Sequence, residues 1–361
     1  MSHPEQIAGL TQTVEDLLRE ARQQGADAAE AAVSTQTGLS VTVRLGETET
    51  IEHTSDNGLG ITVYFGHRKG SANTTDLRPA AIRESVAAAC RIARHTSEDP
   101  AAGLADPDLL ASDVPDLDLY HPWSLDADQA ADIARDCEDA ARAADPRIGN
   151  SEGATLYTQS SSFVYGNSNG FVGGYPSSRH TLSCAVIARQ GEEMQRDYWY
   201  DSGRLPAELA EPAAIGRRAA ERTLARLGGR RLGTRECPVL FRADVAPSLL
   251  RSLFGAIRGH AVYRKSTFLL DRVGTQVFPD WVQISEDPLR PRGQASAPFD
   301  NEGVATRQRD LVSDGVLQGY LLDSYAARKL GLRSTGNAGG VRNARIADSG
   351  QSFEALLREM G

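Results

Sequence analysis

The order of helical and strand-like patterns along the chain constrains its fold most. Apolar side chains recur at helical spacing over residues 5–24, and a second helix is predicted over residues 78–95. Between these helices, apolar and polar residues alternate near residues 41–45 and 61–65, which is typical of half-buried strands. The first hundred residues therefore predict a helix, strands and a second helix.

The same order then recurs. A helix is predicted over residues 126–144, strands over 147–200 and another helix over 207–227. Residues 97–122, which separate the two series, form an acidic connector broken by prolines. Because helix, sheet and helix occur twice before residue 230, the order suggests an internal duplication, although the two halves show no similarity residue by residue.

The remainder of the chain predicts a smaller, β-rich unit. A strand at residues 238–241 is followed by a helix over 244–258, and a hairpin is expected over 304–322. The hairpin turns at Asp314-Gly315, a dipeptide that favours tight β-turns. A short helix over residues 323–330 comes after it.

These elements predict an α+β fold of mostly antiparallel sheets with flanking helices. We expect two domains, an N-terminal α+β domain over residues 1–230 and a β-rich C-terminal domain over residues 235–361. The net charge of −9 disfavours nucleic acid as a direct partner. No apolar run approaches the roughly 18–20 residues of a membrane helix. The first residues do not resemble a secretion signal, so we expect a cytoplasmic protein.

The histidines and cysteines argue against a zinc site carried on one helix. Such sites place two histidines about one turn apart. No two of the seven histidines lie within five residues of each other; they are His3, His53, His67, His95, His121, His180 and His260. The four cysteines lie far apart, and we expect buried, reduced thiols.

Two short sequences resemble functional motifs but have a simpler interpretation. Residues 166–170 match G-x-S-x-G, yet residues 171–176 cannot begin the helix that a nucleophile elbow requires, so we expect a turn between strands. Residues 66–71 resemble a phosphate-binding loop without its spacing or its helix. A basic hairpin tip is the better interpretation.

Two polar segments remain as candidates for binding. The first combines Tyr263, Arg264, Lys265 and Ser266, and its alternatives are a solvated face or a contact with a substrate or partner. The second is the glycine-rich loop 334–340, where backbone without side chains would let a peptide approach closely. An ordinary surface loop is the alternative there.

The chain resembles the TldD/PmbA family of metallopeptidases, specifically its PmbA (TldE) branch. The resemblance runs through the whole chain in order, which makes it far more specific than any short motif. The matching stretches are VYFGHRKGSANTTDL (63–77), LYHPWSLD (119–126), GNSNGFVGGYPSSRHTLSC (166–184), GHAVYRKSTFLLDRVG (259–274), RGQASAPFDNEGV (292–304), GYLLDSYAARKLG (319–331) and STGNAGG (334–340).

The resemblance implies a cytoplasmic proteolytic function on small or unfolded peptides, in a family earlier described as modulators of DNA gyrase. In this family the TldD subunit carries zinc through an HExxxH helix and a distant cysteine, whereas the PmbA subunit lacks them. In this chain Arg251, Ser252 and Ala256 fall at the three motif positions, and none of these side chains can ligate zinc or activate its water. We therefore expect no cofactor in this chain and zinc in a TldD-type partner.

Two hypotheses stay open. In the first, the chain is a subunit of a peptidase that has no catalytic activity without its partner. In the second, it is a regulatory or adaptor protein without enzymatic activity. Both leave seven residues as candidates for contacts with a peptide or partner: Tyr263, Arg264, Lys265, Ser266, Arg328, Lys329 and Asn337. Family members continue beyond the position of Gly361, so the second domain is expected to be incomplete at its C-terminus.

Overall fold

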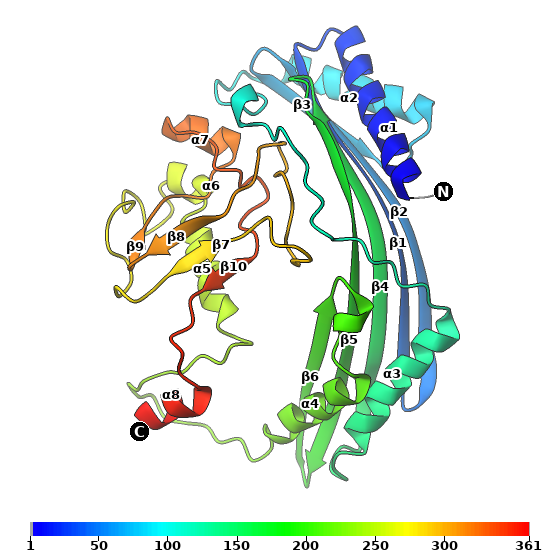
Figure 1. Ribbon diagram of the computed structural model, residues 1–361, viewed down its shortest axis with the longest axis vertical. Helices are drawn as coiled ribbons and strands as arrows, with labels where there is room; N and C mark the ends of the chain where they lie inside the picture. Colours follow the sequence, from blue (N-terminus) through cyan, green and yellow to red (C-terminus); the bar gives the residue numbers. More distant parts are fainter. Residues whose placement is uncertain (1–2, 361) are drawn as a thin grey trace.

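The computed structural model describes residues 3–360 and contains two antiparallel sheets (Figure 1). The larger sheet has six strands, most of them long and curved, in the order β3-β2-β1-β4-β5-β6. The sheet and the helices that flank it comprise, in chain order, α1 (His3–Gln23), β1 (Ala28–Arg44), β2 (Glu47–Phe65), β3 (Arg68–Thr74), α2 (Pro79–His95), α3 (Ala127–Arg142), β4 (Asn150–Asn167), β5 (Val172–Gln190), β6 (Glu193–Gly203) and α4 (Pro212–Leu224).

The smaller sheet has four short strands in the order β10-β7-β8-β9. It belongs to a unit composed of α5 (Pro247–Ala256), α6 (Gly259–Tyr263), β7 (Ile284–Glu286), β8 (Arg309–Ser313), β9 (Val316–Leu317), α7 (Ser324–Leu330), β10 (Ala344–Ile346) and α8 (Phe353–Glu359). Every pairing between these named strands is antiparallel, which confirms the predicted α+β class with flanking helices.

Alternation along β1 explains why the large sheet has helices on one face. Val33 and Val41 are fully buried, whereas their neighbours along the strand are not. Val33 packs in a core with α1 and α2, and Val41 packs in a core with α3 and α4. The opposite face carries Glu30 and Ala32, and there the smaller sheet lies alongside the upper half of the large one (Figure 1).

The large sheet repeats one element order around its centre. Helix, three strands and helix occur first as α1 to α2 and again as α3 to α4, and the strand order is mirrored about the β1–β4 pair. Each half has one glycine at a close approach. A Cβ on Gly70 would lie 2.2 Å from the Ala89 oxygen of α2, and a Cβ on Gly216 of α4 would lie 2.0 Å from the Cys137 oxygen of α3. Only glycine lets these backbones pack so closely.

The acidic connector joins the two sheets. Apart from the short 3-10 helix Pro107–Leu109, it has no helix between residues 97 and 122. The Ala111 N–H donates to the Gly303 oxygen at 2.9 Å, and the Ala305 N–H donates to the Leu109 oxygen at 3.0 Å. The connector is thus part of the structure rather than a loose linker. The domain limits at residues 230 and 235 stay a prediction.

An aromatic core reinforces this junction. The ring of Phe299 lies 5.0 Å from that of Phe171 and 5.5 Å from that of Tyr175, centroid to centroid.

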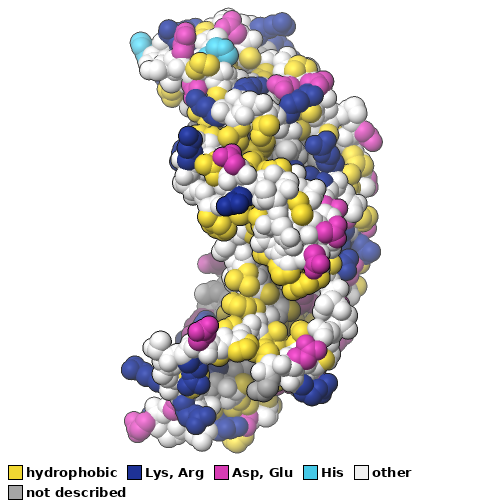
Figure 2. Space-filling view, turned by 90° about the vertical axis from the view of Figure 1, so that its left-hand side faces the viewer, with side chains coloured by type: hydrophobic (Ala, Val, Ile, Leu, Met, Phe, Trp, Pro, Cys, Tyr) yellow, Lys and Arg dark blue, Asp and Glu magenta, His cyan; other side chains and the backbone are white. Residues whose placement is uncertain are grey.

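On the side of the molecule seen in Figure 2, hydrophobic side chains gather across the middle. Within residues 3–360, no helix has both the length and the apolar character needed to cross a bilayer.

Candidate functional site

A pocket of about 540 Å³ lies between the helix-free face of the large sheet, which carries Glu30 and Ala32, and the loops of the smaller unit. β1 contributes Glu30, the loop before β8 contributes Glu302, and the start of α7 contributes Asp323. Three carboxylates therefore face one space. The rest of the lining is small or polar: Ala31, Ala32, Gly60, Ile61, Thr62, Ser71, Ala72, Asn73, Tyr165, Asn301, Ala338 and Gly339.

Two tyrosines fix the position of Glu30. The Tyr64 hydroxyl donates to Oε1 of Glu30 at 2.9 Å, and the Tyr165 hydroxyl donates to Oε2 at 2.8 Å. Burial, together with the negative charge of Glu30, raises the pKa of both phenols. Both hydroxyls therefore keep their protons near neutral pH and hold both oxygens of the carboxylate.

Glu302 is a buried carboxyl whose pKa is shifted into the neutral range. The pKa of Glu302 is raised to about 7, chiefly by burial; hydrogen bonds from Ser324, whose N–H donates to Oε2 at 2.9 Å, oppose the shift, and the negative charges of Asp300 and Asp323 add to it. Burial likewise raises the pKa of Asp300 to about 6. The charge of the pocket therefore changes close to neutral pH.

A histidine stands at the edge of this acidic pocket. His260 of α6 lies with Nε2 3.0 Å from Oδ2 of Asp323, and its ring stacks on Tyr325 at a centroid distance of 6.0 Å. Asp323 also accepts the Ala326 N–H at 2.7 Å, which caps α7. A second pocket of about 520 Å³ includes His260 and shares Glu30, Glu302 and Asp323 with the first.

Sequence reasoning missed this pocket. Glu30 lies more than 200 residues before His260 and Glu302, so only the fold brings the three together. A signal was available for His260 and Glu302, since both lie within the stretches 259–274 and 292–304 that carry the family resemblance. The site combines carboxylates, phenols and an imidazole, so its chemistry favours a positively charged group and the exchange of protons.

The structure places the first predicted segment at the surface beside this pocket. Tyr263 is half-buried next to His260, with ring centroids 5.3 Å apart, and its hydroxyl accepts from Nε of Arg264 at 3.1 Å. Arg264, Lys265 and Ser266 are exposed. Only Tyr263 of this segment contacts the histidine at the edge of the pocket through its ring.

Arg328 and Lys329 of α7 bind the acidic connector. Arg328 donates to the backbone oxygens of Ala101, Gly103 and Leu104. Lys329 pairs with Asp99 at 2.7 Å. The two cations that were candidates for partner contacts thus have acceptors within the chain itself.

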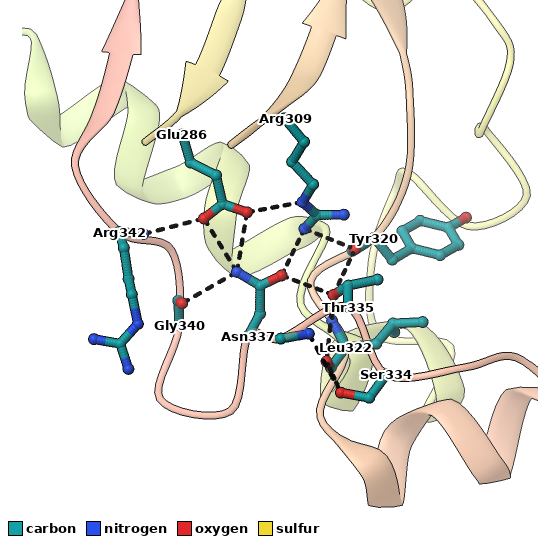
Figure 3. A network of polar contacts seen from close by, with 10 residues as sticks. Glu286, Arg309, Tyr320, Leu322, Ser334, Thr335, Asn337, Gly340 and Arg342 are labelled. Atoms are coloured by element: carbon teal, nitrogen blue, oxygen red, sulfur yellow. Dashed lines mark hydrogen bonds and ion pairs between the residues drawn. The ribbon is translucent and has the colours of Figure 1, made fainter. Parts of the chain in front are cut away.

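Asn337 lies in a buried polar network rather than on a surface (Figure 3). Its Nδ2 donates to both carboxylate oxygens of Glu286 at 3.1 Å, and its Oδ1 accepts from Nη2 of Arg309 at 2.6 Å. Arg309 in turn pairs with Glu286 at 2.8 Å. Asn337 therefore shapes the loop whose next residues, Ala338 and Gly339, line the acidic pocket.

The three positions of the metal motif lie on α5. Arg251 and Ser252 are exposed and Ala256 is half-buried. Their side chains offer no zinc ligand, so the residues present do not fit a zinc ion. Elsewhere in the described part of the chain, no three His, Cys, Asp or Glu side chains are grouped closely enough to hold a metal.

Three family models match almost the whole chain. They describe the PmbA/TldA metallopeptidase domain 1 over residues 29–93, the central domain over residues 120–227 and the C-terminal domain over residues 234–361. The chain therefore belongs to the PmbA/TldD metallopeptidase family. This confirms the resemblance identified in the sequence.

Among its relatives, the chain is most informatively compared with proteins of the PmbA branch. It is 53% identical to Metalloprotease PmbA of Escherichia coli O157:H7 over 335 residues, which are 93% of this chain and 74% of that protein. It is 46% identical to a Metalloprotease PmbA homolog of Haemophilus influenzae, over 98% of this chain and 78% of that protein. A Metalloprotease TldD homolog of Haemophilus influenzae matches only 28% of this chain and 21% of its own length, at 32% identity.

Solved structures share the fold. A crystal structure described as a proposed modulator of DNA gyrase, from Bacteroides thetaiotaomicron, superposes with a TM-score of 0.89 at 26% identity, covering 97% of this chain and 79% of that chain. TldE from Thermococcus kodakarensis gives a TM-score of 0.80 at 20% identity, over 96% of this chain and 80% of its own, which shows the fold alone.

Proposed function

We propose that this chain is a PmbA (TldE)-type subunit of a cytoplasmic metalloprotease that degrades or processes small or unfolded peptides. It acts together with a TldD-type partner, and the partner carries the zinc. The observation that carries the proposal is the sequence of α5, PSLLRSLFGA, which contains no His, Cys, Asp or Glu at the place where the resemblance puts the metal motif. A chain with these residues needs another subunit to supply the metal and the base.

The structure supports a role in holding a peptide. The acidic pocket opens between two sheets, where an extended chain has access to both side chains and backbone. Glu30, Glu302 and Asp323 attract a positively charged group, such as a peptide amino terminus or a lysine side chain. Contacts through the backbone depend little on sequence, which suits an enzyme acting on unfolded peptides.

The test is partner dependence. The isolated chain, its zinc-bearing relative from the same organism and an equimolar mixture are each incubated with a fluorogenic unfolded peptide. We expect no cleavage by the isolated chain and clear cleavage by the mixture. A mixture in which the glutamate of the relative's HExxxH motif is replaced by glutamine is the control, and it should be inactive. Stoichiometric zinc together with cleavage in the isolated chain would contradict the proposal.

A regulatory or adaptor role is the second candidate. The same side chains on α5 favour it, because they remove catalysis without removing the fold. In that case the chain would bind its partner yet leave peptide cleavage unchanged. The same experiment separates the two, since a mixture no more active than the zinc-bearing relative alone supports the adaptor.

A further inference from the structure

A second groove, separate from the acidic pocket, lies where the end of β6 meets residues 290–294 and β10. Its volume is about 750 Å³. Arg290, Arg292 and Arg345 line it, and Glu208 is its single carboxylate. We call this surface the arginine groove. In a chain with a net charge of −9, it is a local excess of positive charge.

The three arginines differ in how far they are already neutralised. Arg292 pairs with Glu208 at 2.8 Å and with Asp118 at 3.5 Å. Within the part of the chain that the structure describes, Arg290 and Arg345 form no ion pair, and both are exposed. Two guanidinium groups therefore face the groove with all their donors available to a ligand.

A buried arginine adds positive charge beneath the groove. Arg204 is only 9% exposed, and its guanidinium donates to the backbone oxygens of Ser178 and Gln294, each at 2.8 Å. Its Nε has no hydrogen-bond partner. Burial, followed by the charge of Arg179, lowers the pKa of Arg204. A buried cation held only by carbonyl groups is stabilised by any anion bound nearby.

The floor of the groove is rigid. The Asn343 side chain donates to the Asp287 oxygen at 2.8 Å and to Ser296 Oγ at 2.6 Å, and it accepts the Ala295 N–H at 2.9 Å. A Cβ on Gly293 would lie 2.3 Å from Ser296 Oγ, so the backbone there is packed against these side chains. Arg290 and Arg292 thus stand on a preorganised loop and Arg345 on strand β10, so the backbone that carries them is ordered before a ligand binds, which lowers the entropic cost of binding.

We propose that the arginine groove binds the carboxylates of an extended acidic peptide segment. This rests on the proposed function and adds to it a preference for acidic sequences. Guanidinium groups match carboxylates in paired, parallel hydrogen bonds. A peptide fits better than a nucleic acid, because the overall charge of −9 repels a long polyanion but tolerates a few carboxylates at a local positive site.

The test is binding of a peptide probe to the full chain, without any partner. A fluorescently labelled, unstructured peptide of alternating glutamate and serine is titrated by fluorescence anisotropy, beside its uncharged counterpart of alternating glutamine and serine. The double variant Arg290→Glu/Arg345→Glu should bind the acidic peptide at least about tenfold more weakly than the wild type. The matched control, Arg83→Glu/Arg91→Glu on exposed positions of α2, changes the net charge equally and should bind within about twofold of the wild type.

Three outcomes would overturn the proposal. These are equal weakening in both double variants, equal affinity for the uncharged glutamine peptide, and full displacement of the acidic peptide by inorganic phosphate at matched ionic strength. The last would make the groove a small-anion site. Circular dichroism on each variant checks that it is folded, and Arg290→Gln/Arg345→Gln gives an intermediate affinity if the variant with glutamates misfolds. Because no cleavage is measured, failure here leaves the partner-dependence result untouched, and the reverse also holds.

Discussion

Individual residues show best where sequence reasoning succeeded and where it could not. Arg251, Ser252 and Ala256, named from the sequence as motif positions, lie together on α5, and their role stays a prediction. Arg328 and Asn337 were named as candidate contacts for a peptide or partner; that role also stays a prediction, and in the structure both side chains bond within the chain. Their acceptors, however, lie about 225 residues away for Arg328 and 51 residues away for Asn337, so no local pattern could reveal what they bind.

Glu302 provides a prediction about pH. Its pKa is raised in the folded chain from 4.5 to about 7. A carboxyl with a raised folded-state pKa contributes stability that is complete below the unfolded pKa and is lost as the pH rises through the folded one. Glu302→Gln cannot ionise, so we expect its free energy of unfolding to rise relative to that of the wild type between pH 4.5 and 7, by about 3 kcal/mol in total.

Urea denaturation at several pH values measures this difference for Glu302→Gln. The control is Glu84→Gln on the exposed face of α2, which should differ from the wild type by the same small amount at every pH. A constant difference for Glu302→Gln across the same range would show that its carboxyl titrates in the folded chain as it does in the unfolded one.

At the scale of elements, the periodicity of the sequence predicted well which turns form, but it did not predict which segments pair as strands. The hairpin expected at Asp314-Gly315 is present between β8 and β9, and both residues have positive φ, 49° and 73°. The turn expected at residues 166–170 joins β4 to β5. By contrast, the strand predicted at residues 238–241 is wrong: the segment is mostly exposed and unpaired, since a strand needs a neighbour that local sequence does not specify.

The packing of α4 against α3, in the second half of the large sheet, depends on Gly216. Gly216→Ala places a methyl group against the Cys137 oxygen of α3, a backbone atom that cannot move aside. We expect a loss of about 2–4 kcal/mol in the free energy of unfolding. Gly9→Ala in α1 is the control, because nothing lies within 4 Å of its Cβ position and alanine favours helix there by about 1 kcal/mol.

Thermal denaturation followed by circular dichroism compares the two glycine variants. The predicted signs are opposite, with a lower melting temperature for Gly216→Ala and a higher one for Gly9→Ala. If Gly216→Ala melted at the wild-type temperature, α3 and α4 would have to be farther apart than the structure shows.

At the scale of the whole molecule, the contact between α7 and the acidic connector joins the two sheets. Arg328 makes the larger contribution, because it satisfies three backbone oxygens of the connector. Lys329 makes only a partly exposed ion pair with Asp99, a kind of contact that typically contributes little to stability because water screens it. Neither connection follows from the sequence, which identifies the acidic connector and the basic helix but not their proximity.

Removing Arg328 should therefore loosen the connector. We expect Arg328→Ala to speed limited proteolysis within residues 97–109 by at least about tenfold, since each unsatisfied buried carbonyl costs about 1–3 kcal/mol. Lys329→Ala is the matched control and should change the rate by less than about threefold. Mass spectrometry of the fragments locates the cleavage. Equal rates in the two variants would assign the joining role to other contacts, such as the aromatic core around Phe299.

The position of the connector also has a consequence for how the chain folds while it is being synthesised. Its backbone groups at Leu109, Ala111 and Leu117 bond to residues 292–305, which leave the ribosome long after the connector itself. At about 5–20 residues per second, the wait lasts on the order of ten to forty seconds. In the later part of that interval, once β6 has been made, the nascent chain has all strands of its large sheet but lacks the residues that cover one face, so it is the stage at which a chaperone would find the most to bind.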